Sequence, residues 1–129
     1  MRIVIGLTLL LLSSITSACQ CAGVPVEITD ENADYIYLGK IVSAKITADG
    51  KVENTLKPID ILRGNPDQWK FLSSQGPVRM CKAMAAVGLR YIVYGRYGEL
   101  PELYLCSNTR HYNPKSSPTL EEIRATANK

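Results

Sequence analysis

The chain has 129 residues with 15 Lys or Arg and 12 Asp or Glu, which gives a formal net charge of +3. The charges are scattered along the sequence, which argues against a strong nucleic-acid-binding surface. A composition of 46 % hydrophobic and 21 % charged residues excludes disordered, collagen-like and coiled-coil chains. We therefore expect one small folded domain.

The first 18 residues have the pattern of a secretory signal. Arg2 supplies a positive charge, residues 3–12 form an apolar run, and residues 13–18 are small or polar. The run is too short to span a bilayer, and no second apolar segment of about 18 residues follows. Cleavage after Ala18 would leave residues 19–129 as one exported domain, in the periplasm or the extracellular space.

Cleavage at this point makes Cys19 the first residue of the mature chain. A bacterial lipoprotein signal also ends before a cysteine, although it favours Leu at the third position before the cut, where this chain has Thr16. A lipid-anchored envelope protein is therefore an alternative. Acylation of Cys19 would leave three thiols in an oxidising compartment, whereas the free form keeps an even number.

The remaining cysteines are Cys21, Cys81 and Cys106, and four cysteines in a small exported domain predict two disulfides. A bridge from Cys19 to Cys21 would close a ring too small for ordinary disulfide geometry. Both are thus expected to pair with Cys81 and Cys106, in either of the two remaining arrangements. A structural zinc site and a Cys-x-Cys redox pair are alternatives. Zinc ligands favour two to four residues between cysteines, and nothing nearby activates the thiols.

Alternating apolar and polar residues predict a long β-strand over residues 35–47. Its apolar face is expected to comprise Ile36, Leu38, Val42, Ala44 and Ile46. Gly39 marks a bend or a close approach of another backbone, and Lys40 is the one charge on the apolar face. Asp49 and Gly50 predict a turn into the next strand.

The rest of the chain predicts further strands and a closing helix. A strand over residues 55–62 contains Pro58, which indicates an edge or a bulge, and residues 63–66 end it. A short strand follows at residues 69–72, and residues 82–87 suit a helical turn. Residues 91–96 and 103–106 resemble a hairpin. Thr119 and Glu122 form a capping-box pattern that begins a short amphipathic helix.

Five strands and a terminal helix favour an all-β fold, a small closed or partly open barrel of the OB type. Trp69 and most tyrosines fall within strand patterns, which predicts core or barrel positions for them. His111 is the one histidine, and it lies among residues typical of a solvated loop. Because no Gly-rich phosphate loop or catalytic set is evident, we expect no enzymatic activity and no cofactor.

Several segments together resemble the netrin-like domain, and more closely the N-terminal domain of the tissue inhibitors of metalloproteinases. The strongest element is the terminal Cys-x-Cys combined with two later cysteines. The segments that carry the resemblance are Cys19-Gln20-Cys21, residues 33–41, residues 59–64, Cys81, residues 91–96, and Leu105 with Cys106. The likeness covers nearly all of residues 19–129. It implies an OB-like barrel with bridges from Cys19 to Cys81 and from Cys21 to Cys106.

The resemblance also implies a function. In that family, the amine and carbonyl of the first cysteine chelate the catalytic zinc of a target protease and displace its water. Cys19 would take this role, Gln20 would enter the specificity pocket, and Cys21, Ala22 and Gly23 would complete the inhibitory edge. We therefore expect a secreted, monomeric inhibitor of zinc metalloendopeptidases. A non-inhibitory netrin-like binding module is the alternative.

Overall fold

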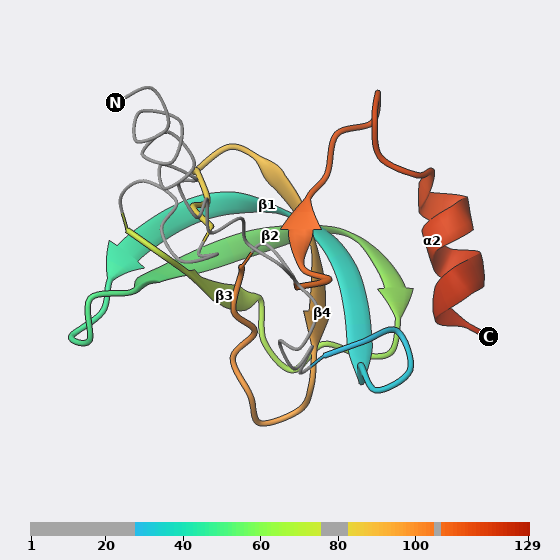
Figure 1. Ribbon diagram of the computed structural model, residues 1–129, viewed down its shortest axis with the longest axis horizontal. Helices are drawn as coiled ribbons and strands as arrows, with labels where there is room; N and C mark the ends of the chain where they lie inside the picture. Colours follow the sequence, from blue (N-terminus) through green and yellow to red (C-terminus); the bar gives the residue numbers. More distant parts are fainter. Residues whose placement is uncertain (1–27, 76–82, 105–106) are drawn as a thin grey trace, which may run out of the picture.

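The computed structural model of this chain describes residues 28–75, 83–104 and 107–129. They form a five-stranded antiparallel sheet and a short helix (Figure 1), as the all-β prediction requires. The strands are β1 (Tyr35–Ile46), β2 (Val52–Arg63), β3 (Lys70–Ser73), β4 (Arg90–Gly95) and β5 (Arg110–His111), in the spatial order β3-β2-β1-β4-β5, and the helix is α2 (Leu120–Ala127). No helix in these three ranges is long and apolar enough to cross a membrane.

The first strand is confirmed, but its predicted apolar face is wrong in two ways. Tyr35 and Tyr37, on the face expected to be polar, are fully buried, whereas Val42 and Ile46 are 50 % and 67 % exposed. The reason is the position of β1 at the centre of the sheet. Its first half pairs with β2 and β4 and has a hydrophobic core on each face, while residues 42–46 pair with β2 alone and belong to neither core.

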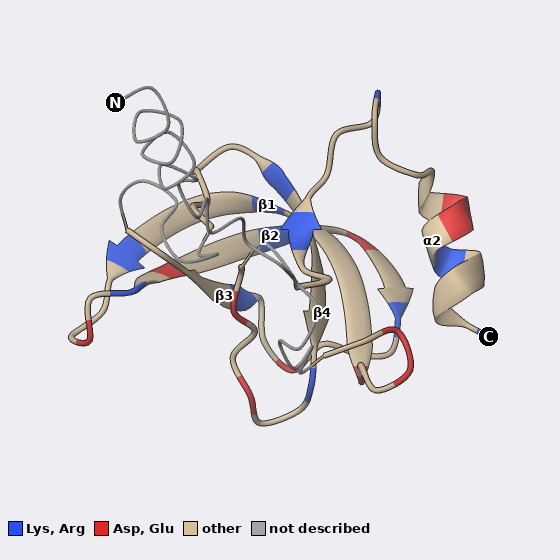
Figure 2. Ribbon diagram, viewed as in Figure 1, with Lys and Arg blue, Asp and Glu red and all other residues tan. Residues whose placement is uncertain are grey.

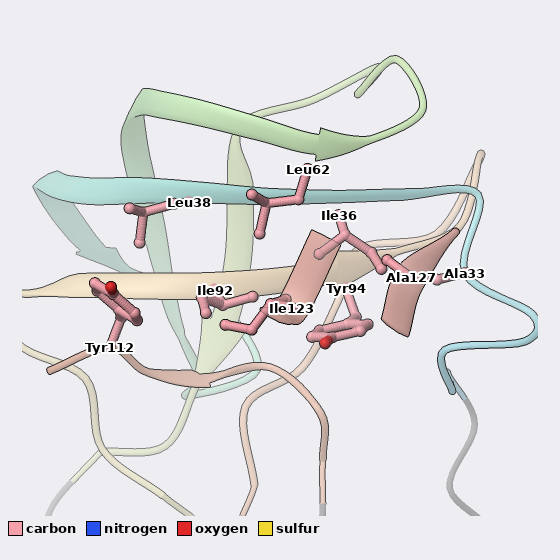
Figure 3. Close-up of a cluster of buried hydrophobic side chains, with 9 residues drawn as sticks. All are labelled: Ala33, Ile36, Leu38, Leu62, Ile92, Tyr94, Tyr112, Ile123 and Ala127. Atoms are coloured by element: carbon pink, nitrogen blue, oxygen red, sulfur yellow. The ribbon is translucent and has the colours of Figure 1, made fainter. Parts of the chain in front are cut away.

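The core on one face of the sheet, here the helix-side core, is covered by α2 (Figure 3). Ile123 and Ala127 of the helix are buried against residues from β1, β2 and β4. The capping box is present as predicted, because Thr119 Oγ1 accepts from the Glu122 amide and Glu122 accepts from the Thr119 amide. The buried residues of this core are Ala33, Ile36, Leu38, Leu62, Ile92, Tyr94, Tyr112, Ile123 and Ala127.

The core on the opposite face is rich in aromatic rings, and we call it the aromatic core. The Trp69 ring packs edge-on against Tyr37, with ring centroids 4.8 Å apart. The ring centroids of Phe71 and Tyr91 lie 5.3 Å apart. The predicted core positions of the tyrosines and Trp69 are thus confirmed for these residues. Its buried members are Tyr35, Tyr37, Ile41, Leu56, Phe71, Tyr91, Val93 and Leu103.

The pairing of β1 with β2 is irregular near Gly39 and Pro58, where the sequence predicts a bend or a bulge. The register between the two strands shifts between Leu38 and Gly39, which opposes Pro58. A Cβ placed on Gly39 would lie 3.1 Å from the Leu56 side chain, so the close neighbour of Gly39 is a side chain and not the backbone that was expected, while the register shift fits the expected bend. The turn at Gly50 is confirmed by its φ of 82°.

The predicted hairpin of residues 91–96 and 103–106 is wrong. β4 pairs with β5 instead, through Tyr91 opposite His111. Leu103 lies parallel to the edge strand β3, where its amide donates to Leu72 O at 2.7 Å and the Leu72 amide donates to Pro101 O at 2.7 Å. These two bonds pair the amide and carbonyl of Leu72 at the outer edge of β3, where a hairpin of residues 103–106 with β4 would have left them unpaired.

The helical turn predicted for residues 82–87 is also wrong over its described part, residues 83–87. Ala83 and Ala85 pack against the aromatic core, and Ala83 O accepts from the Ser74 amide at 3.1 Å. The Gly88 amide then donates to Ile41 O at 2.8 Å. The backbone of this segment therefore bonds to neighbouring strands at both ends, and its one local bond, from the Leu89 amide to Ala86 O at 3.2 Å, forms a turn rather than a helix.

Candidate functional site

The residues proposed for inhibition lie outside the described ranges. These are Cys19, Gln20, Cys21, Ala22 and Gly23, together with the predicted bridge partners Cys81 and Cys106. Their predicted roles and pairings therefore stay predictions. The structure does describe the residues that flank each of the three cysteine-bearing segments, and these flanks form the candidate site.

The described chain begins beside the segment that contains Cys106. Asn108 Nδ2 donates to the carbonyl oxygen of Ile28 at 3.1 Å. Asn108 is two residues beyond Cys106, and Ile28 is seven residues beyond Cys21. Seven extended residues span up to about 25 Å, so the chain from Ile28 has ample length to bring Cys21 back to Cys106.

The flanks of Cys106 are themselves fixed to one another. The Ser107 amide donates to Tyr104 O at 3.0 Å, and Ser107 Oγ lies 2.9 Å from the carbonyl oxygens of Tyr104 and Thr109. Thr109 is buried, and its hydroxyl accepts from the Tyr94 amide of β4 at 3.1 Å. The chain on both sides of Leu105 and Cys106 is thereby attached to the sheet.

The described residues that follow Cys81 in the chain lie beside the residues that flank Cys106. Ala83 and Met84 line an open cavity of about 190 Å³ together with Tyr104 and Ser107, which flank Cys106. The other lining residues are Tyr91, Leu103, Thr109, Arg110 and His111. A smaller cavity of about 80 Å³ is lined by Ile28, Tyr104, Ser107 and Asn108, among others. The described residues nearest to Cys21, Cys81 and Cys106 thus gather around Tyr104 and Ser107.

His111 does not lie in a loop, as the sequence predicted, but in β5. It is exposed, as expected, and its ring meets the Tyr91 ring edge-on at a centroid distance of 5.5 Å. Over residues 28–75, 83–104 and 107–129, no group of three or more His, Cys, Asp or Glu side chains is placed to hold a metal ion.

Burial also raises the pKa values of tyrosines in the aromatic core. Desolvation raises the pKa of the Tyr37 hydroxyl far above its ordinary value, and the neighbouring Tyr35 adds to the increase. Desolvation likewise raises the pKa of Tyr91. Both increases follow from the packing of these rings in the aromatic core.

The contact between Ile28 and Asn108 was not foreseen from the sequence. Asn108 belongs to the stretch around His111 that the sequence predicts as a solvated loop, and its place two residues after Cys106 is the one signal in the sequence for this contact. Comparison with models of known protein families gives no match, and comparison with the sequences of curated proteins gives none either. A functional assignment therefore depends on the residues and their geometry.

Proposed function

We propose that this protein is an exported, non-enzymatic inhibitor of zinc metalloendopeptidases. The inhibitory group is the free amine and the carbonyl oxygen of Cys19, exposed by cleavage after Ala18. Gln20 enters the specificity pocket of the protease, and Cys21, Ala22 and Gly23 extend the contact. The observation that carries the proposal is the convergence of the described flanks of Cys21, Cys81 and Cys106 around Tyr104 and Ser107.

The convergence bears on the predicted bridges. Cys81 is two residues before Ala83, and Cys106 lies between Tyr104 and Ser107. These residues line one cavity, which supports a common anchoring point for the predicted bridges from Cys19 to Cys81 and from Cys21 to Cys106. Two such bridges would hold residues 19–21 in place before binding, so that little conformational entropy is lost on docking.

The scaffold in this proposal is a partly closed, OB-like barrel of the netrin type. Support comes from the parallel contact between Leu72 of β3 and residues 101–103, which joins the edge strand to the chain that follows β4. The strong register shifts between β1 and β2 add to it, because bulges increase the curvature of a sheet.

The chemistry follows from the coordination of catalytic zinc. Such zinc keeps one position for water or substrate, and an amine and a carbonyl on one residue form a five-membered chelate that fills it. The amine binds only in its neutral form, which is accessible near neutral pH. The Cys19–Gln20 peptide bond lies at the metal but is not hydrolysed, because the chelate has displaced the water that would attack its carbonyl.

The proposal is tested by extending the N-terminus. Three proteins are compared: the exported protein, a variant extended by one alanine before Cys19, and a control extended by one alanine after Lys129. Inhibition by each is measured against a panel of zinc endopeptidases. We expect the native protein and the control to inhibit and the N-terminal extension to abolish inhibition. Equal inhibition by all three would contradict chelation. If the native protein inhibits no member of the panel, the inhibitor function itself is wrong and a netrin-like binding module is favoured.

A further inference from the structure

Three basic residues on three adjacent strands lie in one row across the sheet. Lys40 of β1 is directly opposite Lys57 of β2 on one side and Arg90 of β4 on the other. Residues directly opposite one another in a sheet project from the same face. All three are exposed, and Figure 2 shows blue segments side by side on β1, β2 and the start of β4. We call Lys57, Lys40 and Arg90 the cationic row.

Carboxylates near the row are engaged by other cations. Glu53 lies 3.0 Å from Lys70 and 3.5 Å from Lys45, and these bases lower the pKa of its carboxyl. Asp60 bonds to Arg124 of α2 at 2.8 Å. No ion pair joins any member of the cationic row to another described residue. The sequence of residues 76–82 contains two basic residues and no acidic one, so that segment offers no counter-charge.

This arrangement weakens the isolated protein, because like charges directly opposite one another in a sheet are destabilising. Three cations held in register by the backbone also raise the local positive potential. Such a surface is suited to an anion supplied from outside the molecule.

An exposed apolar side chain adjoins the cationic row. Val42, two residues beyond Lys40 on β1, is 50 % exposed. Leu89 is also exposed, but the Ile41 amide donates to its carbonyl oxygen at 3.0 Å, so Leu89 stands opposite Ile41 on the face of the aromatic core, away from the row. Cations beside apolar side chains are typical of surfaces that bind the interface of anionic membranes. The apolar side chain therefore favours a membrane interface over a soluble polyanion.

Acidic residues gather away from the row, at the other end of β4. The Tyr97 amide donates to Asp34 Oδ2 at 2.8 Å, and the Gly98 amide donates to Asp67 Oδ2 at 3.3 Å. In Figure 2 the loops below the sheet carry most of the red segments. A membrane that meets the cationic row would therefore not meet these carboxylates.

We propose that the cationic row, together with Val42, docks the protein on the surface of a membrane that contains anionic phospholipid. The anchoring groups are the three cations, which pair with lipid phosphates, while the Val42 side chain enters the interface. This docking surface is independent of the inhibitory residues, so a protease assay does not test it.

The test is cosedimentation of the exported protein with vesicles of phosphatidylcholine alone or mixed with phosphatidylglycerol. The variant Lys40→Gln/Lys57→Gln is compared with the control Lys51→Gln/Lys129→Gln, which loses the same charge elsewhere. Each basic residue contributes about a fivefold increase in binding to an anionic surface, so the first variant should bind about thirtyfold more weakly and the control nearly normally. Val42→Ser should weaken binding without changing its dependence on salt. All proteins share one N-terminus, so any contribution from that segment cancels.

Binding that requires phosphatidylglycerol, falls with added salt and is lost in the row variant alone would support the proposal. Absence of binding to the mixed vesicles would overturn it, as would equal loss in the control. Dextran sulfate and duplex DNA are tested in parallel. Binding to either of these, with none to the vesicles, would assign the cationic row to a soluble polyanion and overturn membrane docking.

Discussion

Gly95, at the end of β4, has no room for a side chain, so a larger residue there should destabilise the protein. It pairs with Tyr35 of β1, and a Cβ placed on it would lie 2.0 Å from Cζ of the Tyr35 ring. Gly95→Ala must displace a fully buried ring, so we expect a loss of about 3 kcal/mol in the free energy of unfolding, measured by urea denaturation. Gly98→Ala is the control. Gly98 has a φ of 77° and no described atom within 4 Å, so the loss there should be about 1 kcal/mol. Equal losses would contradict the packing of Tyr35 against Gly95.

Tyr37 carries a buried hydroxyl for which the described part of the chain provides no hydrogen-bond partner. Removal of such a group restores the free energy lost by its desolvation. Tyr37→Phe should therefore keep or raise the stability of the protein, by up to about 1 kcal/mol in urea denaturation. Tyr37→Leu should cost about 2 kcal/mol or more, because the contact with Trp69 is lost. Destabilisation by Tyr37→Phe would show that the hydroxyl is bonded after all.

The raised pKa values of the buried tyrosines predict how stability depends on alkaline pH. A group whose pKa is raised by folding favours the folded state at pH values below its unfolded pKa. Its contribution is lost as the pH rises toward the folded pKa. For Tyr37 and Tyr91 this window opens above about pH 10. We expect phenolate absorbance to appear together with loss of the circular dichroism signal. Phenolate formation by these rings in a protein that stays folded would contradict their burial.

Among the elements, α2 is attached by its cap as well as by its buried face. Thr119→Ala removes the side chain that accepts from the Glu122 amide, so we expect a loss of about 1 kcal/mol in thermal or urea unfolding. Thr126→Ala, at an exposed position late in the same helix, should cost less than about 0.5 kcal/mol. Similar losses at the two positions would show that the cap does not set the stability of the helix.

The central strands predict a gain in stability from loss of charge. Lys40 has a like charge opposite it on each side, so Lys40→Gln should stabilise the protein by about 0.5 kcal/mol at low salt, and less at high salt. Lys45→Gln is the matched control, because Lys45 faces Glu53 and its loss should leave stability unchanged or slightly lower. A Lys40→Gln variant less stable than the native protein would contradict repulsion in the row.

Elements with strong local signals were predictable from the sequence. The long strand, the turn at Gly50 and the capped helix each depend on residues close together in the chain, and all three are confirmed. The pairing of β4 with β5 was not predictable, because β5, in which His111 lies opposite Tyr91, has only two residues. The helical turn that the sequence predicts at residues 82–87 fails for a related reason. Its alanines favour a helix locally, whereas bonds to Ser74 and Ile41 fix it against the sheet.

At the scale of the whole molecule, the sequence hid the arrangement of charge. Lys40, Lys57 and Arg90 are far apart in the chain, and their charges look scattered until the register places them in one row. The candidate site shows the same limit. Its cysteines could be found from the sequence, but the bond from Asn108 to Ile28 depends on the folded chain bringing distant segments together. The inhibitory residues themselves stay a prediction.

The inhibitor proposal requires a mature chain that begins at Cys19 with a free amine and carries two disulfides. Intact mass spectrometry of the exported protein, before and after reduction, reports all three features at once. We predict the mass of residues 19–129 less four hydrogens, with the four hydrogens regained on reduction. A chain that begins at another residue, an acylated Cys19, or a mass unchanged by reduction would contradict the account.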